Sequence, residues 1–204
     1  MGKEAVFELS GGALCLDFAN SVGDRPRCAN DLLVDYAALV AFGRQASVLS
    51  EHEARNLGRA ANRGPAAAAA AFHRAIEVRE TLYRLFAAVA DGEPVPPREL
   101  ARFNENLAGA LPHLRVVRDG EELQWSWSGP RDALDRVLWP VLRSAAHLLT
   151  SDRRGRVRQC SSETCSWLFI DRSPGLRRRW CDMKSCGNRA KARRHYRRKR
   201  AAAS

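Results

Sequence analysis

The sequence predicts a mainly α-helical (α+β) protein, in which a helical N-terminal domain with a small β-hairpin precedes a compact cysteine-rich segment. Three observations support this class. Apolar residues recur at helical spacing over much of residues 31–149, one short stretch alternates with a period of two, and four closely spaced cysteines lie among arginines near the end. A chain of 204 residues holds one domain of ordinary size and a small appendage. We therefore expect two domains, 1–152 and 153–204.

Two helices are expected in the first third of the chain. Residues 31–45 place apolar side chains every three or four positions, with Asn30 or Asp31 as the capping candidate. Ser50 and Glu53 then match a capping box, in which the two side chains bind N–H groups that a helix start leaves free. This second helix should extend to about residue 63.

The longest expected helix begins with an alanine tract. It starts near Ala66, carries a broad apolar face that includes Phe72 and Phe86, and ends near Gly92. The stretch GEPVPP follows as a linker. A further helix should begin at about Pro97, because proline is tolerated in the first helical turn.

The pattern changes after residue 112. Asp119 and Gly120 separate two short runs, the second of which alternates, and this is typical of a β-hairpin with a two-residue turn. Helical spacing returns over residues 134–149. Pro140 should kink that helix, because proline lacks an N–H group and clashes with the preceding turn.

Charge divides the chain sharply. The net charge is +11, and residues 151–204 hold 17 Lys/Arg against 4 Asp/Glu, so the excess lies entirely in the last quarter. Such asymmetry indicates a polyanionic partner for this part. The N-terminus has no signal-peptide pattern, and no apolar run approaches the roughly 18 residues of a membrane span. We expect a cytoplasmic protein that does not bind membranes.

The four C-terminal cysteines form two pairs of equal spacing. Four residues separate Cys160 from Cys165 and Cys181 from Cys186, and fifteen residues lie between the pairs. Two close pairs can set four sulfurs around one ion, and zinc accepts four thiolates. So few bulky apolar residues lie between them that a basic unit of this size needs a cross-link to fold. The leading interpretation is one structural Zn²⁺.

Two alternatives to a structural zinc stay open. Disulfides or free thiols are the first, although reducing conditions in the cytosol disfavour disulfides. A catalytic zinc is the second, but it needs an open coordination position that four cysteines do not leave. Cys15 and Cys28 lie at no useful spacing and are expected to be buried or free thiols, and His195 is expected to face solvent or phosphate.

The residues after Cys186, GNRAKARRHYRRKR, should form a helix that is basic nearly all round. No acidic residue interrupts Lys184 to Arg200, and the metal would hold one end. A charge run is often only a solvated face, but these features favour a nucleic-acid partner and salt-dependent affinity. The candidate contacts, to phosphates or to base edges, are Arg177, Arg178, Arg179, Lys184, Asn188, Arg189, Lys191, Arg193, Arg194, Arg197 and Arg198.

The stretch RRWCDMKSCGNRAKARRHYRRK resembles the CGNR zinc finger, a family named after the tetrapeptide that begins here at Cys186. Upstream, CSSETCSWLFIDRS matches the first half of that finger. The opening FELSGGALCLDFANSVGDR resembles the ABATE domain, which usually precedes it. The ABATE signature appears as Leu16, Asp17, Phe18 and Asn20, with Ser21 where threonine is commoner.

The resemblance implies a mostly helical N-terminal domain with a small β element, then a treble-clef-like finger with Cys160, Cys165, Cys181 and Cys186 as zinc ligands. It also implies a stress-induced transcription regulator whose finger binds DNA and whose N-terminal domain senses an effector. Asp17 and Asn20 are then the candidate ligand pocket. The simpler interpretation is that Asp17 caps backbone amides and Asn20 makes a structural hydrogen bond.

The main alternative function is that of an RNA-binding or ribosome-associated zinc protein. Trp167, Phe169, Trp180 and Tyr196 could stack on unpaired bases, although the tryptophans are also the natural core of a small finger. DNA is favoured over RNA. A homodimer would extend the few bases that one small finger contacts.

An enzyme is not expected, and no catalytic residue is assigned. His73 and Glu77 fall one helical turn apart, and Asp17 could pair with Arg25. Neither pair assembles a nucleophile, a base and an orienting group, so these residues are expected to be surface charges or caps.

Overall fold

The structure is a computed structural model that describes residues 5–27 and 29–201, without the side chains of residues 195, 197, 198, 200 and 201. Cys28 lies outside these residues. The α-helices of the described chain are α1 (Leu14–Ala19), α2 (Tyr36–Gln45), α3 (Glu51–Arg63), α4 (Pro65–Asp91), α5 (Pro97–Ala110), α6 (Leu138–Thr150) and α7 (Asn188–Ala201). The mainly helical α+β class predicted from the sequence is confirmed.

The strands pair as short antiparallel ribbons. The pairs are β1 (Val22–Asp24) with β2 (Ala29–Asp31), β3 (Leu114–Asp119) with β4 (Glu122–Trp127), and β5 (Val157–Gln159) with β6 (Leu168–Ile170). Short 3-10 turns cover Arg25–Arg27, Leu111–His113 and Asp152–Arg156, and a π-helical turn covers Met183–Gly187. Only the β3–β4 hairpin was expected from the sequence, because the other strands have three residues each and show no alternation.

Helix ends follow local sequence signals. The Ser50 hydroxyl accepts a hydrogen bond from the Glu53 N–H, and the Glu53 carboxylate accepts one from the Ser50 N–H, which is the predicted capping box of α3. Pro65 opens α4, and Gly92 ends it with a φ of 75°, a left-handed conformation that glycine adopts without strain. Helix α5 begins at Pro97, as expected.

Helix α2 begins later than predicted and has a different cap. Its N-cap is Asp35, whose carboxylate accepts a hydrogen bond from the Ala38 N–H at 2.8 Å, so the assignment to Asn30 or Asp31 is wrong. Asp31 belongs to β2 instead, and its carboxylate binds the guanidinium of Arg79. The caps were misassigned because several Asx residues precede the helix and only one lies next to its first turn.

Two further expectations shift by a few residues. Helix α6 begins at Leu138, so Pro140 lies in its first turn. The N–H groups of a first turn have no partner within the helix, so this proline removes no hydrogen bond and the reason for the predicted kink is absent. In the β3–β4 hairpin Asp119 pairs with Glu122, which leaves Gly120 and Glu121 as the turn.

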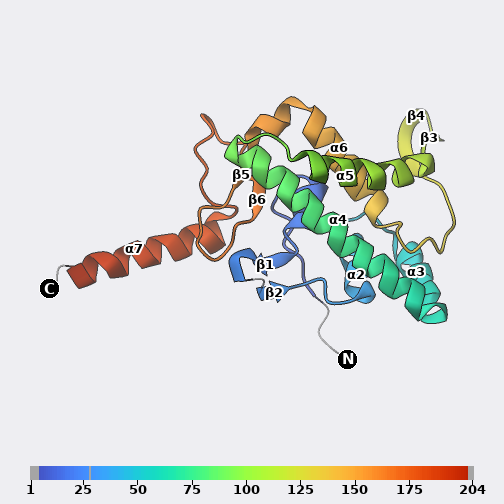
Figure 1. Cartoon of the computed structure of the whole chain (residues 1–204), viewed down its shortest axis with the longest axis horizontal. Coiled ribbons are helices and arrows are strands. Elements are labelled where there is room, and N and C mark those ends of the chain that lie inside the picture. The colour runs from blue at the N-terminus through green and yellow to red at the C-terminus, as the bar shows by residue number, and fades with distance from the viewer. Residues whose placement is uncertain (1–4, 28, 202–204) are drawn as a thin grey trace.

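Helix α4 crosses the molecule, and α1, α2, α3 and α5 pack against it (Figure 1). The core between them is aromatic and aliphatic, with Phe18, Phe42 and Phe86 fully buried. Val157 and Leu168, from β5 and β6, are also fully buried and belong to this same core. The C-terminal segment is therefore anchored in the hydrophobic core of the N-terminal part.

The two ends of the molecule differ in character. Helix α7 projects from the body at one end, and the β3–β4 hairpin lies at the opposite end (Figure 1). Among the helices of the described chain, none is both long enough and apolar enough to pass through a membrane.

Candidate metal centre and nucleic-acid interface

The first two cysteines are held by the β5–β6 ribbon of the C-terminal segment, here called the finger (residues 157–201). The Cys160 N–H donates a hydrogen bond to the Trp167 carbonyl at 2.8 Å, which extends the ribbon beyond β5. Cys165 lies in the connection between the strands, where its N–H donates to the Ser162 carbonyl at 3.1 Å. This tight turn brings both sulfurs to one side.

The other two cysteines lie at the start of the basic helix. Cys181 precedes the π-helical turn and Cys186 lies within it. Asp182 caps this turn by accepting a hydrogen bond from the Ser185 N–H at 2.8 Å. Gly187 follows directly, and a β-carbon there would lie 2.8 Å from the Met183 sulfur. The close packing accounts for glycine after the last cysteine.

The four sulfurs fit one zinc ion. All four Sγ atoms lie within 4.8 Å of one another, and all four residues are buried. Cys181 Sγ is 3.6 Å from Cys165 Sγ and 3.7 Å from Cys186 Sγ. A tetrahedral site with zinc–sulfur bonds of about 2.3 Å sets its sulfurs about 3.8 Å apart. Bound zinc would supply a structural cross-link with no open position for catalysis.

The thiols cannot ionise independently when they lie this close. Hydrogen bonds from the Cys165 and Cys181 thiols lower the pKa of Cys160, and the Cys160 thiolate in turn raises the pKa values of Cys165 and Cys181. A divalent cation removes this conflict, because it stabilises every thiolate at once. Arg189 adds a second positive charge, since its Nη2 donates to Cys186 Sγ at 3.1 Å.

Arg178 is a candidate nucleic-acid contact whose guanidinium makes contacts inside the finger. Its guanidinium donates to the carbonyls of Trp180 and Cys181 and lies 4.6 Å from the centre of the Phe169 ring. The backbone N–H of Arg178 donates to Asp171, a fully buried carboxylate. Burial opposes ionisation of Asp171, but hydrogen bonds from Ser173 and Arg178 outweigh it and lower the pKa of this carboxyl.

The remaining candidate contacts differ in how they are held. Asn188 donates to the Lys184 carbonyl at 3.1 Å, and Arg193 lies 3.6 Å from the Glu163 carboxylate. The side chains of Arg197, Arg198 and His195 lie outside the described ones. The exposed basic side chains of the candidate set are Arg177, Arg179, Lys184, Arg189, Lys191 and Arg194.

Asn20 joins the N-terminal domain to the finger. Its amide donates to the Leu168 carbonyl at 2.8 Å and accepts from the Leu168 N–H at 2.9 Å, and the residue is only 2% exposed. Next to it, the Trp167 indole N–H donates to the Val22 carbonyl at 2.6 Å. Tyr83 completes this junction, because its hydroxyl donates to the Ser166 carbonyl at 3.1 Å.

Asp17 lies one turn earlier in α1 and caps a backbone group. Its carboxylate accepts a hydrogen bond from the Gly11 N–H at 2.7 Å. Burial raises the pKa of Asp17 to about 6, although that hydrogen bond opposes the shift. Asp17 and Asn20 thus make the contacts that the simpler interpretation describes. Their role as a ligand pocket stays a hypothesis.

A partly buried ion-pair network links α4 to the β1–β2 ribbon, and sequence patterns gave little sign of it. Arg79 is 4% exposed and donates to both carboxylate oxygens of Asp31, at 2.7 and 2.8 Å. Arg25 pairs with Glu80 at 2.7 Å rather than with Asp17, and its guanidinium lies 3.7 Å from the Tyr83 ring centre. The only local signal was an Arg–Glu pair set among the apolar residues of α4.

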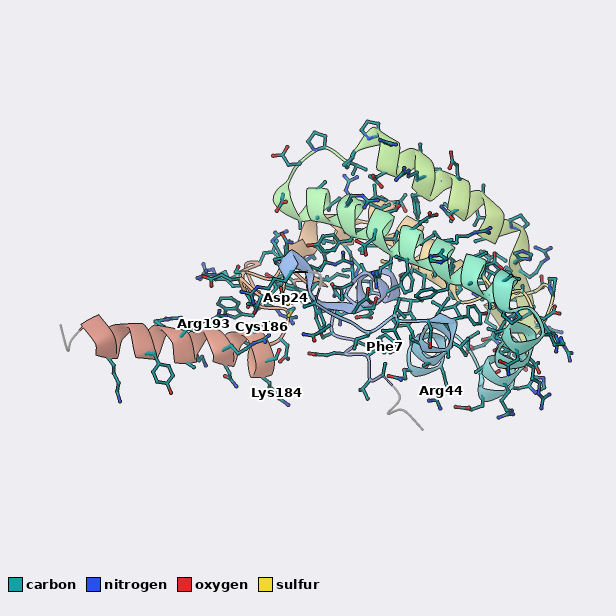
Figure 2. The ribbon with its side chains drawn as sticks, turned by 60° about the horizontal axis from the view of Figure 1, so that its bottom comes forward. Phe7, Asp24, Arg44, Lys184, Cys186 and Arg193 are labelled. Carbon is teal, nitrogen blue, oxygen red and sulfur yellow. The ribbon has the colours of Figure 1, made fainter. Side chains whose placement is uncertain are left out.

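A cleft of about 540 Å³ lies between the β1–β2 ribbon and the base of α7 (Figure 2). Its lining includes Asp24 from the body and Lys184 and Arg189 from the finger. One carboxylate oxygen of Asp24 is buried without a hydrogen-bond partner in the described structure. Neither Asp17 nor Asn20 lines this cleft.

Fold and site together define a helical domain that carries a four-cysteine zinc finger with a basic terminal helix. Among known families, residues 12–152 match ABATE, described as "Putative stress-induced transcription regulator", and residues 156–199 match the CGNR zinc finger. The chain belongs to the ABATE family, with a CGNR zinc finger at its C-terminal end. The resemblance inferred from the sequence is confirmed. Comparison with individual curated proteins found no match.

Proposed function

We propose that this protein is a DNA-binding transcription regulator, in which the zinc finger holds the base of α7 and presents the helix to duplex DNA. One observation carries the proposal: a helix rich in exposed cations projects from a folded body (Figure 1) and is anchored by the π-helical turn that precedes it. Cys186 is buried two residues before the start of α7, whereas Lys191 and Arg194 on the helix are exposed.

The size of α7 suits a major groove. Its 14 residues span about 21 Å, and the groove, about 12 Å wide, admits an α-helix. Arginine and lysine bind phosphates and guanine edges alike, so most of these contacts position the helix and only some select a sequence. Arg189 donates a hydrogen bond to Cys186 Sγ. The position of its guanidinium on the DNA-facing helix would therefore depend on whether the finger is folded around its metal.

The contacts of the aromatic residues support DNA over RNA. Recognition of unpaired bases needs exposed aromatic faces. Phe169 is fully buried and Trp167 is 8% exposed, because both form the small core of the finger with the cysteines. Trp180 is half-buried and Tyr196 is exposed, so a stacking platform of four aromatic rings is not formed. RNA binding remains the alternative.

The test is selection of bound sequences from random pools of duplex DNA and of RNA, with zinc-loaded full-length protein near physiological salt. We expect enrichment of a duplex motif and its loss after the metal is stripped. Equal retention of all duplexes would mean that the arginines bind phosphates alone. Tighter binding to RNA than to any duplex would replace the DNA proposal with the RNA alternative.

A salt titration separates the role of α7 from general attraction. Each phosphate contact contributes a slope of about −0.9 to log K against log salt. Lys191→Ala removes one expected phosphate contact, so the slope should become less negative by about 0.9. Arg55→Ala is the matched control, because Arg55 is exposed on α3, which lies far from α7 (Figure 1), and it should leave the slope unchanged.

The wider role follows from this proposal and from the family description. We propose a cytoplasmic regulator of a stress response that binds an effector through its N-terminal domain and forms a homodimer. No enzymatic activity is proposed. His73 and Glu77 are both exposed on α4 and offer surface charges rather than a catalytic group.

A further inference from the structure

The β3–β4 hairpin leaves an apolar face largely exposed in the single chain, although the Arg143 guanidinium lies 4.8 Å from the centre of the Trp125 ring. Val116 is 55% exposed, Leu123 is 74% exposed and Trp125 is 56% exposed. Val116 pairs with Trp125 across the ribbon, so their side chains lie on one face together with that of Leu123. An isolated two-stranded ribbon is marginally stable and has two open edges. Pairing with a further strand would therefore stabilise this ribbon.

The hydrogen-bond pattern shows which groups of β3 point outward. The Ser128 N–H donates to the His113 carbonyl at 2.8 Å, so residue 113 is a hydrogen-bonded position of the ladder. Antiparallel ladders alternate, and residues 115, 117 and 119 therefore also point their backbone groups toward β4. The N–H and C=O groups of Leu114, Val116 and Arg118 point to the open edge.

The open edge of β4 is less suited to another strand. The outward carbonyl of Trp127 already accepts a hydrogen bond from Arg136 Nη2 at 3.2 Å. The charged residue of β4 is Glu122, and the strand has no cation to face it in a second copy. The edge of β3 is mostly free and carries charges of both signs.

Strand β3 is complementary to itself in one antiparallel register, centred on Val117. In this register Arg115 of each copy faces Asp119 of the other, and Val117 faces its own equivalent. Val116 and Arg118 of opposite copies become the hydrogen-bonded pairs, as their outward backbone groups require. Opposite charges on facing residues stabilise a pair of strands, and here the contact occurs twice by symmetry.

Two neighbouring registers also pair the outward backbone groups, but their facing side chains are less favourable than those of the register centred on Val117. Centring on Arg118 sets two arginines against each other. Centring on Val116 faces Arg115 with Val117 and Arg118 with Leu114, so no ion pair forms. A shift by one residue would present inward-pointing backbone groups and break the ladder.

We propose that two copies of the chain pair antiparallel through β3, about Val117, and form a continuous four-stranded sheet. The inference gives a surface to the proposed homodimer and does not depend on DNA binding. Helix α7 lies at the opposite end of the molecule, so both basic helices stay free in the dimer (Figure 1). One pair of strands buries less than the roughly 1,200 Å² of standard interfaces, and the dissociation constant should be about micromolar.

The experiment is sedimentation equilibrium of zinc-loaded full-length protein from about 1 to 200 μM, a range set by the expected affinity. Asp119→Arg and Arg115→Asp should each raise the dissociation constant about tenfold or more, because two attractive pairs become repulsive. The double variant Arg115→Asp/Asp119→Arg should restore dimerisation. Glu93→Arg between α4 and α5 is the matched control, with the same change of charge as Asp119→Arg at an exposed site outside β3, and should dimerise like the natural chain.

The rescue is needed because both residues have local contacts. Asp119 accepts a hydrogen bond from Gln124 at 2.9 Å, and Arg115 donates to the Leu114 carbonyl at 2.7 Å. Failure of the double variant to recover would overturn the proposed register. A monomer at every concentration would overturn the dimer itself, and duplex binding measured in parallel would show whether the proposed regulator stands without it.

Discussion

At the scale of single residues, Asn20 and Asp17 serve the interior of the protein. The Asn20 side chain donates one N–H to the Leu168 carbonyl and accepts from the Leu168 N–H through its oxygen, as the backbone of a neighbouring strand would. Asp17 holds the Gly11 N–H while losing most of its own hydration. A small polar side chain therefore ties the finger to the body, and a carboxylate makes the fold sensitive to pH.

Asn20→Ala should lower the free energy of unfolding by about 2–3 kcal/mol, because it leaves two backbone groups of Leu168 buried without partners. Urea unfolding of the zinc-loaded protein measures the change. Asn104→Ala on α5 is the control, since Asn104 is exposed, and it should stay within about 0.5 kcal/mol of the natural chain. An equal effect of both substitutions would contradict a role for Asn20 at the junction.

Asp17→Asn should make stability less dependent on pH. The folded pKa of about 6 exceeds the usual value of about 3.9, so the folded state holds its proton longer than the unfolded state does. The contribution of Asp17 to the free energy of unfolding is therefore largest below about pH 4, and it is lost as the pH rises through about 6. Asparagine can keep the Gly11 hydrogen bond and stays neutral, so the variant should gain about 1–3 kcal/mol over the natural chain between pH 4 and 7.

The measurement is denaturant unfolding of both chains at several pH values. Proton competition at the cysteines is common to both chains and cancels in the difference. A difference in unfolding free energy that does not vary with pH would show that the Asp17 carboxyl keeps an ordinary pKa.

At the scale of elements, the finger depends on two pieces that do not form a core by themselves. The β5–β6 ribbon supplies Cys160 and Cys165, and the π-helical turn before α7 supplies Cys181 and Cys186. The finger's own buried cluster consists of the cysteines with Trp167 and Phe169. A metal cross-link therefore contributes a large share of what holds the ribbon and the turn together.

Cys186→Ser should abolish tight zinc binding and unfold the π-helical turn with the start of α7. Metal content by native mass spectrometry should fall below one ion per chain, and circular dichroism should lose helix signal. Cys15→Ala is the control, because Cys15 is a buried thiol of the body, and that variant should keep one zinc. A folded, metal-loaded Cys186→Ser chain would contradict the assignment of this ligand.

At the scale of the whole molecule, the N-terminal domain and the finger share one hydrophobic core. Val157, Leu168 and Ile170 are at most 2% exposed and pack in the same core as α1, α4 and α6. The Ile170 N–H also donates to the Gly11 carbonyl at 2.9 Å. The charge of the sequence changes near residue 152, but residues on both sides of this point contribute to the same hydrophobic core.

Zinc removal should therefore destabilise the whole chain. Thermal unfolding of the zinc-loaded protein should show one transition, whether followed by helix signal or by tryptophan fluorescence, and a chelator should lower its midpoint for both probes. Two separate transitions, with the body unchanged after chelation, would show that the finger folds independently of it.

The sequence by itself determined the features whose causes lie within a turn or two of chain. These features depend on near neighbours or on composition: the capping box of Ser50 and Glu53, the proline and glycine at the ends of α4, the spacing within each cysteine pair, and the basic helix. Tertiary structure alone decided the partner of Asn20, 148 residues away, the pairing of Arg79 with Asp31 and the inward use of Arg178. The physical reason is that a polar side chain has many acceptable partners, and only the packing of distant segments selects one.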